Sequence, residues 1–214
     1  GNFKDLKVDF DETCTQNIPS YRSSASRAAE ALILVGKKDK ALEVLDLANR
    51  EIPIEKYNDP RSLSSIVYGY IVAGQEQKGL KLAEQLKKDI FQEYDYYLSL
   101  DKKEQRYVKK QMATQPVLYS LVVGAVCDAY NKVGQKDKGY NYLVKSIDPI
   151  DKRFNDFISS LKMLGKEKAY KEAENVRKVT PFYTYLFEIM KPYDSTYPKE
   201  KESQITTQIM QATE

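Results

Sequence analysis

The sequence predicts an all-α protein built as an array of helical hairpins, and two observations indicate this fold. An eleven-residue pattern occurs three times, at residues 35–45, 73–83 and 133–143, each time with a glycine, a short polar turn and then a small residue. Apolar residues recur at helical spacing before and after each turn. A repeated helix-turn-helix unit is typical of proteins whose hairpins stack side by side.

The composition excludes several classes of function. The 214 residues include 34 basic and 31 acidic side chains, a net charge of only +3, so we expect no nucleic-acid partner. There is no His, and Cys14 and Cys127 are too few for a zinc site or a disulfide framework, so we expect two lone buried thiols. Without His the common catalytic triads are absent, and no glycine-rich phosphate loop is present. We therefore expect no catalysis by this chain, no metal and no cofactor.

Residues 1–20 are predicted to form an irregular N-terminal arm. Val8 and Phe10 alternate with charged residues, which suits a short extended segment lying on the body of the protein. Pro19 is expected to stop a helix from running through this segment.

Residues 21–149 are predicted to form three hairpins. The first helix runs from Tyr21 to Gly36, and its predicted apolar face consists of Ala25, Ala28, Ala29, Leu32 and Val35. Its partner carries Ala41, Leu42, Leu45 and Ala48 and stops near Pro53. Small alanines let the two helices approach closely. The second hairpin is expected to start at Asp59 as N-cap, with Pro60 at the first helical position, and to turn at Gly74.

The third hairpin follows an insertion. Gly36 and Gly74 are 38 residues apart, whereas Gly74 and Gly134 are 60 apart. The extra residues, at about 93–115, are predicted to extend the preceding helix and to add a turn or helix. Pro116 is expected to open the next helix, whose apolar run at 117–126 is shorter than the roughly 20 residues that span a bilayer.

Residues 150–214 are predicted to form a degenerate fourth hairpin and capping helices. One helix should end at Leu164 and Gly165, and its partner should follow through Val176. Thr180 is expected to cap a short aromatic helix that ends at Met190, and a last helix should run from Pro198 to Met210. Helical arrays need such end helices to cover the stack.

The hairpins resemble tetratricopeptide repeats, a helix-turn-helix family with a period of about 34 residues. Small residues occupy the matching position of the second helix in all three copies, as Ala41, Gly79 and Gly139. The resemblance implies a right-handed α-solenoid whose first helices line a concave groove. The groove residues would be Ser26, Glu30, Ile33, Ser64, Tyr68, Ile71, Asp128, Asn131 and Lys132. The Lys and Asn set that holds a peptide carboxylate in some members is absent, and the groove could equally hold a partner segment or the chain's own arm.

The insertion holds two further candidate surfaces. One is an aromatic patch of Tyr94, Tyr96, Tyr97 and Tyr107, which could stack on sugars or bases, although packing of the extra helix explains these residues as well. The other is the basic run of Lys102, Lys103, Arg106, Lys109 and Lys110. This run fits an anionic lipid surface or nucleic acid, and it also fits a solvated helix face.

A second resemblance covers residues 7–100 best. The segments that carry it include Asp11-Glu12-Thr13, Tyr21-Arg22, the run from Gly36 to Ala41, and the run from Tyr96 to Leu100. They look like the soluble C-terminal region of a bacterial family of multi-spanning membrane proteins of uncharacterised function. The membrane part of that family is similar to protein O-mannosyltransferases. The chain begins without Met, as expected for a piece of a larger protein.

This resemblance implies a place on the periplasmic side of the bacterial inner membrane. We expect a non-catalytic interaction module that docks on a membrane glycosyltransferase-like domain of the same parent chain, or that recruits an acceptor to it. The partner would then be a protein or peptide segment close to a membrane surface. A free-standing peptide-binding adaptor and a carbohydrate-binding domain are the alternatives.

Overall fold

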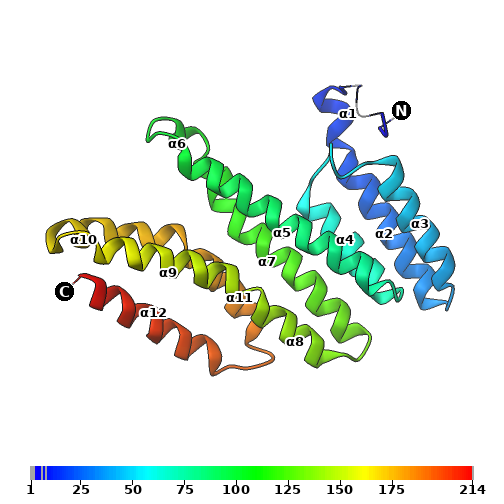
Figure 1. The fold of residues 1–214 in the computed structure, drawn as a ribbon. Coiled ribbons are helices and arrows are strands. Elements are labelled where there is room, and N and C mark those ends of the chain that lie inside the picture. The colour runs from blue at the N-terminus through cyan, green and yellow to red at the C-terminus, as the bar shows by residue number, and fades with distance from the viewer. Residues whose placement is uncertain (1–2, 6, 8, 214) are drawn as a thin grey trace. The chain divides into compact units, whose positions relative to one another are not determined.

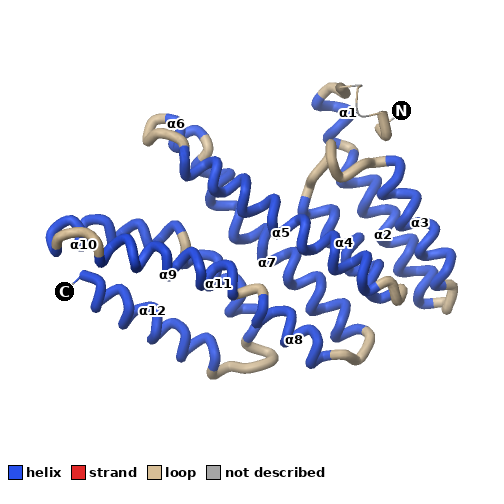
Figure 2. Tube along the Cα trace, in the orientation of Figure 1, coloured by secondary structure: helices blue, strands red, loops and turns tan. Residues whose placement is uncertain are grey.

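The computed structural model describes residues 3–5, 7 and 9–213, and Figure 1 shows its helices. The predicted all-α class is confirmed, because the regular structure of these residues is entirely helical (Figure 2). The chain divides into two compact units, residues 1–139 and 140–214, and each is described by itself. The division falls within α8 (Lys136–Lys145), ahead of the boundary expected at residue 149.

Residues 1–139 are built around α4. The helices of this unit are α1 (Glu12–Gln16), α2 (Ile18–Leu34), α3 (Lys38–Glu51), α4 (Pro60–Val72), α5 (Glu76–Ser99), α6 (Glu104–Tyr107) and α7 (Lys109–Lys132). α4 packs against α2, α5 and α7, while α2 also packs against α3 and α5 against α7. The buried side chains of α4, among them Leu63, Ile66 and Val67, therefore form the centre of this unit's core.

The three repeated turns have the same backbone geometry. Gly36, Gly74 and Gly134 have φ values of +76°, +95° and +75°, a conformation that glycine adopts without the cost of a Cβ atom. After α2, the Lys37 amide donates to the Leu32 carbonyl at 2.8 Å and the Gly36 amide donates to the Ile33 carbonyl at 3.0 Å. The same pair of bonds closes α4 and α7. The predicted glycine helix stops are thus confirmed as Schellman caps.

The start of the second hairpin also follows the sequence prediction. The Asp59 side chain accepts hydrogen bonds from the amides of Arg61 at 3.3 Å and Ser62 at 3.0 Å, and Pro60 is the first helical residue. Later, a Cβ atom on Gly79 would lie 2.6 Å from Ile71 Cγ1. α4 and α5 therefore approach too closely for a side chain at this position, which is the steric role expected of the small residue.

The N-terminal segment is more helical than predicted. Asp11 caps α1 by accepting a bond from the Cys14 amide at 2.7 Å, and α2 already begins at Ile18. Pro19 lies in the first turn of α2, where the amide that proline lacks would have no helical partner. Phe3 packs against Tyr57, with ring centroids 5.9 Å apart, so the segment does lie on the body. Val8 lies outside the described residues.

The buried face of α2 differs from the predicted one. Ile18, Arg22, Ser26 and Ala29 are buried, whereas Ala28 and Val35 are exposed. The face is rotated because Arg22 and Ser26 find hydrogen-bond partners inside the unit. A pattern of apolar residues cannot reveal a face that is partly polar.

The α5–α7 pair explains the insertion. α5 and α7 have 24 residues each, and the short α6 joins them, so the predicted helix extension and extra helix are confirmed. Pro116 does not open a helix, because α7 begins at Lys109 and runs through it. Proline inside a helix costs about 3 kcal/mol, which the packing of the buried Pro116 region must offset.

α7 is long and apolar enough to cross a membrane by length and composition alone, contrary to the expectation from its short apolar run. Half of the relevant window is buried within the protein, and α7 packs against both α4 and α5. We therefore describe α7 as a core helix of residues 1–139.

Residues 140–214 contain α9 (Asp148–Lys162), α10 (Lys166–Glu172), the 3₁₀ helix η1 (Ala173–Lys178), α11 (Thr180–Met190) and α12 (Tyr197–Thr213). The predicted aromatic and final helices are confirmed as α11 and α12. The predicted partner of α9 is split into α10 and η1. Thr180 does not cap α11, since its hydroxyl donates to the Val176 carbonyl at 3.2 Å. The core of this unit includes Phe154 and Tyr183, whose rings meet edge to face with centroids 6.2 Å apart.

Candidate functional site

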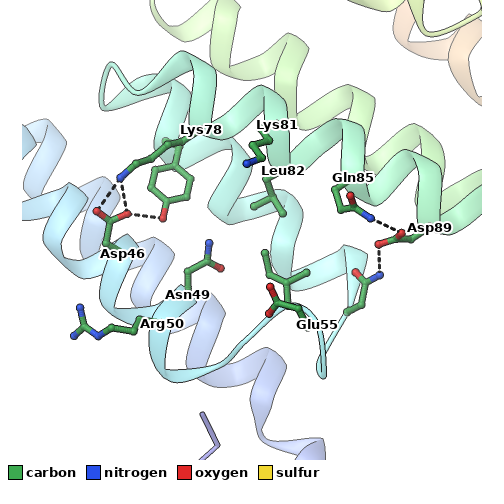
Figure 3. Close-up of a pocket in the computed structure, with 12 residues that line it drawn as sticks. Asp46, Asn49, Arg50, Glu55, Lys78, Lys81, Leu82, Gln85 and Asp89 are labelled. Carbon is green, nitrogen blue, oxygen red and sulfur yellow. Dashed lines mark hydrogen bonds and ion pairs between the residues drawn. The ribbon is translucent and has the colours of Figure 1, made fainter. Parts of the chain in front are cut away.

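A pocket of ≈ 1030 Å³ lies between α3, the linker that follows it, and α5, and we call it the α3–α5 groove (Figure 3). Tyr70 of α4 also reaches it. The lining residues are Asp46, Asn49, Arg50, Ile54, Glu55, Asn58, Tyr70, Lys78, Lys81, Leu82, Gln85 and Asp89. All of them belong to residues 1–139.

One end of the groove is closed by a tyrosine, a carboxylate and a lysine. The Tyr70 hydroxyl donates to Asp46 Oδ1 at 2.7 Å, and Lys78 Nζ donates to Asp46 Oδ1 and Oδ2 at 3.1 and 3.0 Å. Burial and then the Asp46 carboxylate raise the pKa of Tyr70 well above its ordinary value. Burial opposes ionisation of Asp46, but the bonds from Tyr70 and Lys78 hold its pKa below the ordinary 3.8. The groups of this cluster thus satisfy one another.

The other end is closed by amide side chains around Asp89. Asn58 of the linker donates to Asp89 Oδ2 at 2.7 Å, and Gln85 donates to Asp89 Oδ1 at 2.7 Å (Figure 3). These bonds attach the linker to α5. Both carboxylate oxygens of Asp89 are therefore already engaged.

Arg22 holds the linker from behind. Its side chain is 0 % exposed, and its guanidinium donates to the carbonyls of Tyr57 at 2.6 Å and Ile52 at 3.0 Å. Burial lowers the pKa of Arg22 to about 10, and the charge of Asp59 opposes that shift, so the group stays charged at neutral pH. Sequence reasoning missed this residue, although its helical spacing from Ile18, Ser26 and Ala29 places it on one face.

Between the two closed ends, the lining includes one buried polar atom and two exposed charged groups without partners among the described residues. Asn49 Oδ1 is buried and accepts no hydrogen bond from any described residue. Lys81 and Glu55 are exposed and form no ion pair within the described part of the chain. Leu82 and Ile54 add apolar surface. A buried acceptor without a donor costs about 1–3 kcal/mol, so a ligand N–H group that reached Asn49 would regain that energy.

A cluster of the same kind forms around the third turn. The Tyr130 hydroxyl donates to Glu76 Oε1 at 2.8 Å, and Lys138 Nζ lies 3.0 Å from Glu76 Oε2. The bonds from Lys138 and then from Tyr130 lower the pKa of Glu76. In both clusters the tyrosine lies four residues before the turn glycine and the lysine four residues after it, a pattern that the sequence could have revealed.

Residues 140–214 contain a cluster of the same composition. Tyr183 and Lys201 each donate to Asp151 at 2.6 Å, so the carboxylate joins α9, α11 and α12. Because three such clusters tie helices together, we assign them a structural role.

The residues expected to line a concave groove fall into two groups. Ser26, Ser64 and Ile71 are each 4 % exposed and are not accessible to a ligand. The Ser26 and Ser65 hydroxyls lie 2.9 Å apart, and Ser64 donates to the Pro60 carbonyl at 2.6 Å. These hydroxyls are satisfied within the contact between α2 and α4.

The second group lies at the surface of α2, α4 and α7. Burial, and after it the negative charges of Glu30 and Asp128, raise the pKa of Tyr68 above its ordinary value. Ile33 is half-buried, and Asn131 and Lys132 are exposed. The structure therefore buries Ser26, Ser64 and Ile71 of the predicted lining, and the concave groove itself stays a prediction.

The predicted aromatic patch also divides. Tyr94 and Tyr97 are buried, and the Tyr97 hydroxyl donates to Glu93. Burial and then Glu93 raise the pKa of Tyr97 to about 12. Tyr96 and Tyr107 remain 60 % and 78 % exposed. Packing therefore accounts for two of the four tyrosines.

The cysteines and acidic residues give no metal site within the described residues. Cys127 is buried as expected, but Cys14 is exposed. No group of three or more cysteine and acidic side chains among the described residues could hold an ion.

Comparison of the chain with protein-family models, with curated proteins and with solved structures found no match. The groove geometry is therefore the basis of the function proposed next.

Proposed function

We propose that residues 1–139 form a non-catalytic interaction module whose α3–α5 groove binds an extended peptide segment. The observation that carries this proposal is a pocket of ≈ 1030 Å³ whose lining includes an exposed cation, Lys81, and an exposed anion, Glu55, beside the apolar side chains of Ile54 and Leu82. Asn49 also lines the pocket, and once its side chain turns toward a bound segment, a backbone amide of that segment would supply the donor that Asn49 Oδ1 lacks. A side-chain amide matches a peptide unit because each contains one carbonyl acceptor and N–H donors.

The charges of the groove favour a peptide over a sugar. Lys81 and Glu55 offer one cation and one anion to the side chains of a segment. Tyr70, the only aromatic residue among the described residues of the lining, has Lys78 Nζ over its ring at 5.5 Å from the centroid. Its face is therefore not open for stacking on a sugar ring.

The proposed architecture is a right-handed array like that of tetratricopeptide repeats. The pairing of α2 with α3 and of α4 with α5, with the same cap at each turn, supports this proposal. Such arrays commonly use their extended surfaces to bind segments of other proteins.

The resemblance of residues 7–100 supplies the proposed biological setting. The bound segment would belong to the membrane glycosyltransferase-like part of the parent chain, or to an acceptor on the periplasmic side of the inner membrane. A free-standing adaptor would use the same groove for a segment of an unrelated protein.

Peptides selected on the wild-type protein from a displayed library of unstructured sequences test the proposal. Asn49→Leu with Lys81→Glu should weaken their binding at least about tenfold, since one lost hydrogen bond and one reversed charge together exceed 1.4 kcal/mol. The matched control, Asn131→Leu with Lys132→Glu, makes the same chemical changes at the surface of α7 and should leave Kd unchanged.

The opposite result would move the binding site to the surface of α2, α4 and α7. If neither pair of substitutions changed Kd, the peptide would bind at neither surface and the proposed function would be wrong. Thermal melting of each variant establishes that it is folded before its affinity is compared.

A further inference from the structure

The end of the α5–α7 pair that carries α6 projects beyond α4. α4 has 13 residues and α5 has 24, and both begin or end at the Gly74 turn. At 1.5 Å per residue, α5 therefore extends about 16 Å past the start of α4. α6 joins the projecting ends of α5 and α7 (Figure 1). We call residues 100–110 the α6 tip.

The α6 tip holds the net charge of the whole chain. Its basic residues are Lys102, Lys103, Arg106, Lys109 and Lys110, and its acidic residues are Asp101 and Glu104. This difference of +3 equals the net charge of the 214 residues, so the remaining charges sum to zero. The tip is thus a concentrated positive patch on an otherwise balanced protein.

The two acidic residues of the tip are engaged with its backbone. Asp101 Oδ1 accepts bonds from the amides of Lys103 and Glu104, both at 2.8 Å. Glu104 Oε2 in turn accepts from the Asp101 amide at 3.1 Å. This reciprocal cap leaves the five basic side chains, all exposed, without an ion pair to any described residue.

The tip is bonded to the end of α5 and carries an exposed ring. The Gln105 side chain donates to the carbonyls of Leu98 at 3.1 Å and Leu100 at 2.9 Å, which joins the tip to the end of α5. Tyr107 is 78 % exposed, and Tyr96 on the last turns of α5 is 60 % exposed. Tyrosine and lysine combine an apolar body with a polar end, the combination found where proteins meet the headgroup layer of a membrane.

We propose that the α6 tip docks on the surface of a bilayer that contains anionic lipids. Five unpaired cations at one projecting end match the negative headgroups, and Tyr107 can rest at their level without inserting a helix. Nucleic-acid phosphates attract lysine as well, but the basic footprint of a nucleic-acid-binding protein typically extends over a face or along a helix. The five cations here are confined to one short projecting end, and the Gln105 amide is already bonded within the tip, so the lipid surface is the better match. This inference is independent of the α3–α5 groove.

Sedimentation of the full chain with vesicles tests the proposal. Vesicles of phosphatidylcholine with phosphatidylglycerol should bind the protein, and vesicles of phosphatidylcholine alone should not. Each basic residue near such a surface contributes roughly a fivefold factor in affinity. Lys102→Glu with Lys103→Glu should therefore weaken binding by more than about 25-fold. The control Lys166→Glu with Lys168→Glu changes the net charge equally in α10 and should bind nearly as well as wild type.

A fluorescent reporter checks that the tip itself makes the contact. The chain has no Trp, so Tyr107→Trp introduces a single reporter at the tip. Its emission should shift to the blue with anionic vesicles. The control Tyr170→Trp replaces a residue of nearly equal exposure, 75 %, on α10, and its emission should not shift.

Three results would overturn the proposal. They are no binding to anionic vesicles, equal losses for the two lysine pairs, and an unchanged emission of the Tyr107→Trp protein. A duplex DNA oligonucleotide serves as a further probe, and tighter binding to it than to the vesicles would assign the tip to nucleic acid instead. All substituted side chains are exposed, and circular dichroism verifies the fold of each variant.

Discussion

The buried contact between α2 and α4 and the α3–α5 groove, both within residues 1–139, differ in whether their polar side chains have hydrogen-bond partners. Between α2 and α4, Ser26 bonds to Ser65 and Ser64 bonds to its own helix backbone, so these groups serve packing. In the α3–α5 groove, Asn49 Oδ1 and Lys81 remain without partners among the described residues. Polar groups therefore indicate a binding surface only where the fold leaves them unsatisfied.

The largest expected effect is a loss of stability on the buried side of α3, the helix that forms one wall of the groove, compared with its exposed side. Leu45 is fully buried and lies against Gly69 of α4, whereas Leu47 is 48 % exposed. Leu45→Ala should lower the free energy of unfolding by about 2–5 kcal/mol. Leu47→Ala should lower it by less than about 0.5 kcal/mol, as for most surface changes. Urea denaturation measures both, and equal losses would contradict this placement of α3.

The second effect tests whether the groove depends on Arg22. Arg22→Met retains much of the side-chain volume but leaves the carbonyls of Ile52 and Tyr57 without their donor. We expect a loss of about 1–3 kcal/mol in the free energy of unfolding, the cost of unsatisfied buried acceptors. Hydrogen exchange of residues 53–58 should accelerate more than that of α7. Unchanged exchange in the linker would show that Arg22 does not hold the groove wall.

A smaller effect compares one tyrosine from each surface. Tyr70 donates a hydrogen bond to Asp46, and Tyr68 has no hydrogen-bond partner among the described residues. Tyr70→Phe should therefore cost about 1 kcal/mol of stability and Tyr68→Phe less than half of that. Thermal melting of the two variants measures both losses. A larger loss for Tyr68→Phe than for Tyr70→Phe would show that the Tyr70–Asp46 hydrogen bond does not stabilise the fold.

The smallest effect concerns alkaline pH. Burial and then a neighbouring carboxylate raise the pKa values of Tyr70, Tyr130 and Tyr183 above the ordinary value of 10. A raised folded-state pKa means that this stabilisation is complete below pH 10 and is lost as the pH rises further. Tyrosinate absorbance should show a late group of tyrosines that ionise only on unfolding. Tyr70→Phe should move alkaline unfolding to higher pH, and an unchanged midpoint would count against the Tyr70 cluster.

The sequence predicted the features that depend on local backbone chemistry. Gly36, Gly74 and Gly134 stop helices because only glycine enters the left-handed conformation cheaply, and Asp59 caps α4 through its own neighbours. The small residue at Gly79 followed from the close approach of paired helices. These signals are short in range, so one sequence suffices to read them.

The features that depend on distant partners were not predicted. Arg22 is buried because carbonyls 30 and 35 residues away accept its bonds, which no periodic pattern reveals. Pro116 lies within α7 because packing overrides its local preference for a helix start. The α3–α5 groove was missed for the same reason, since its unpartnered Asn49 becomes unusual only when the surrounding side chains are placed.

The most direct test of the peptide-binding groove is a nuclear magnetic resonance titration of the isotope-labelled chain with a selected peptide. We expect the signals of the Asn49 side-chain amide and of the Lys81 and Leu82 backbone amides to shift most. The signal of the Tyr68 backbone amide, at the surface of α2, α4 and α7, should not shift. Large shifts of the Tyr68 and Asp128 signals with none at Asn49 would show that the peptide does not bind in the α3–α5 groove.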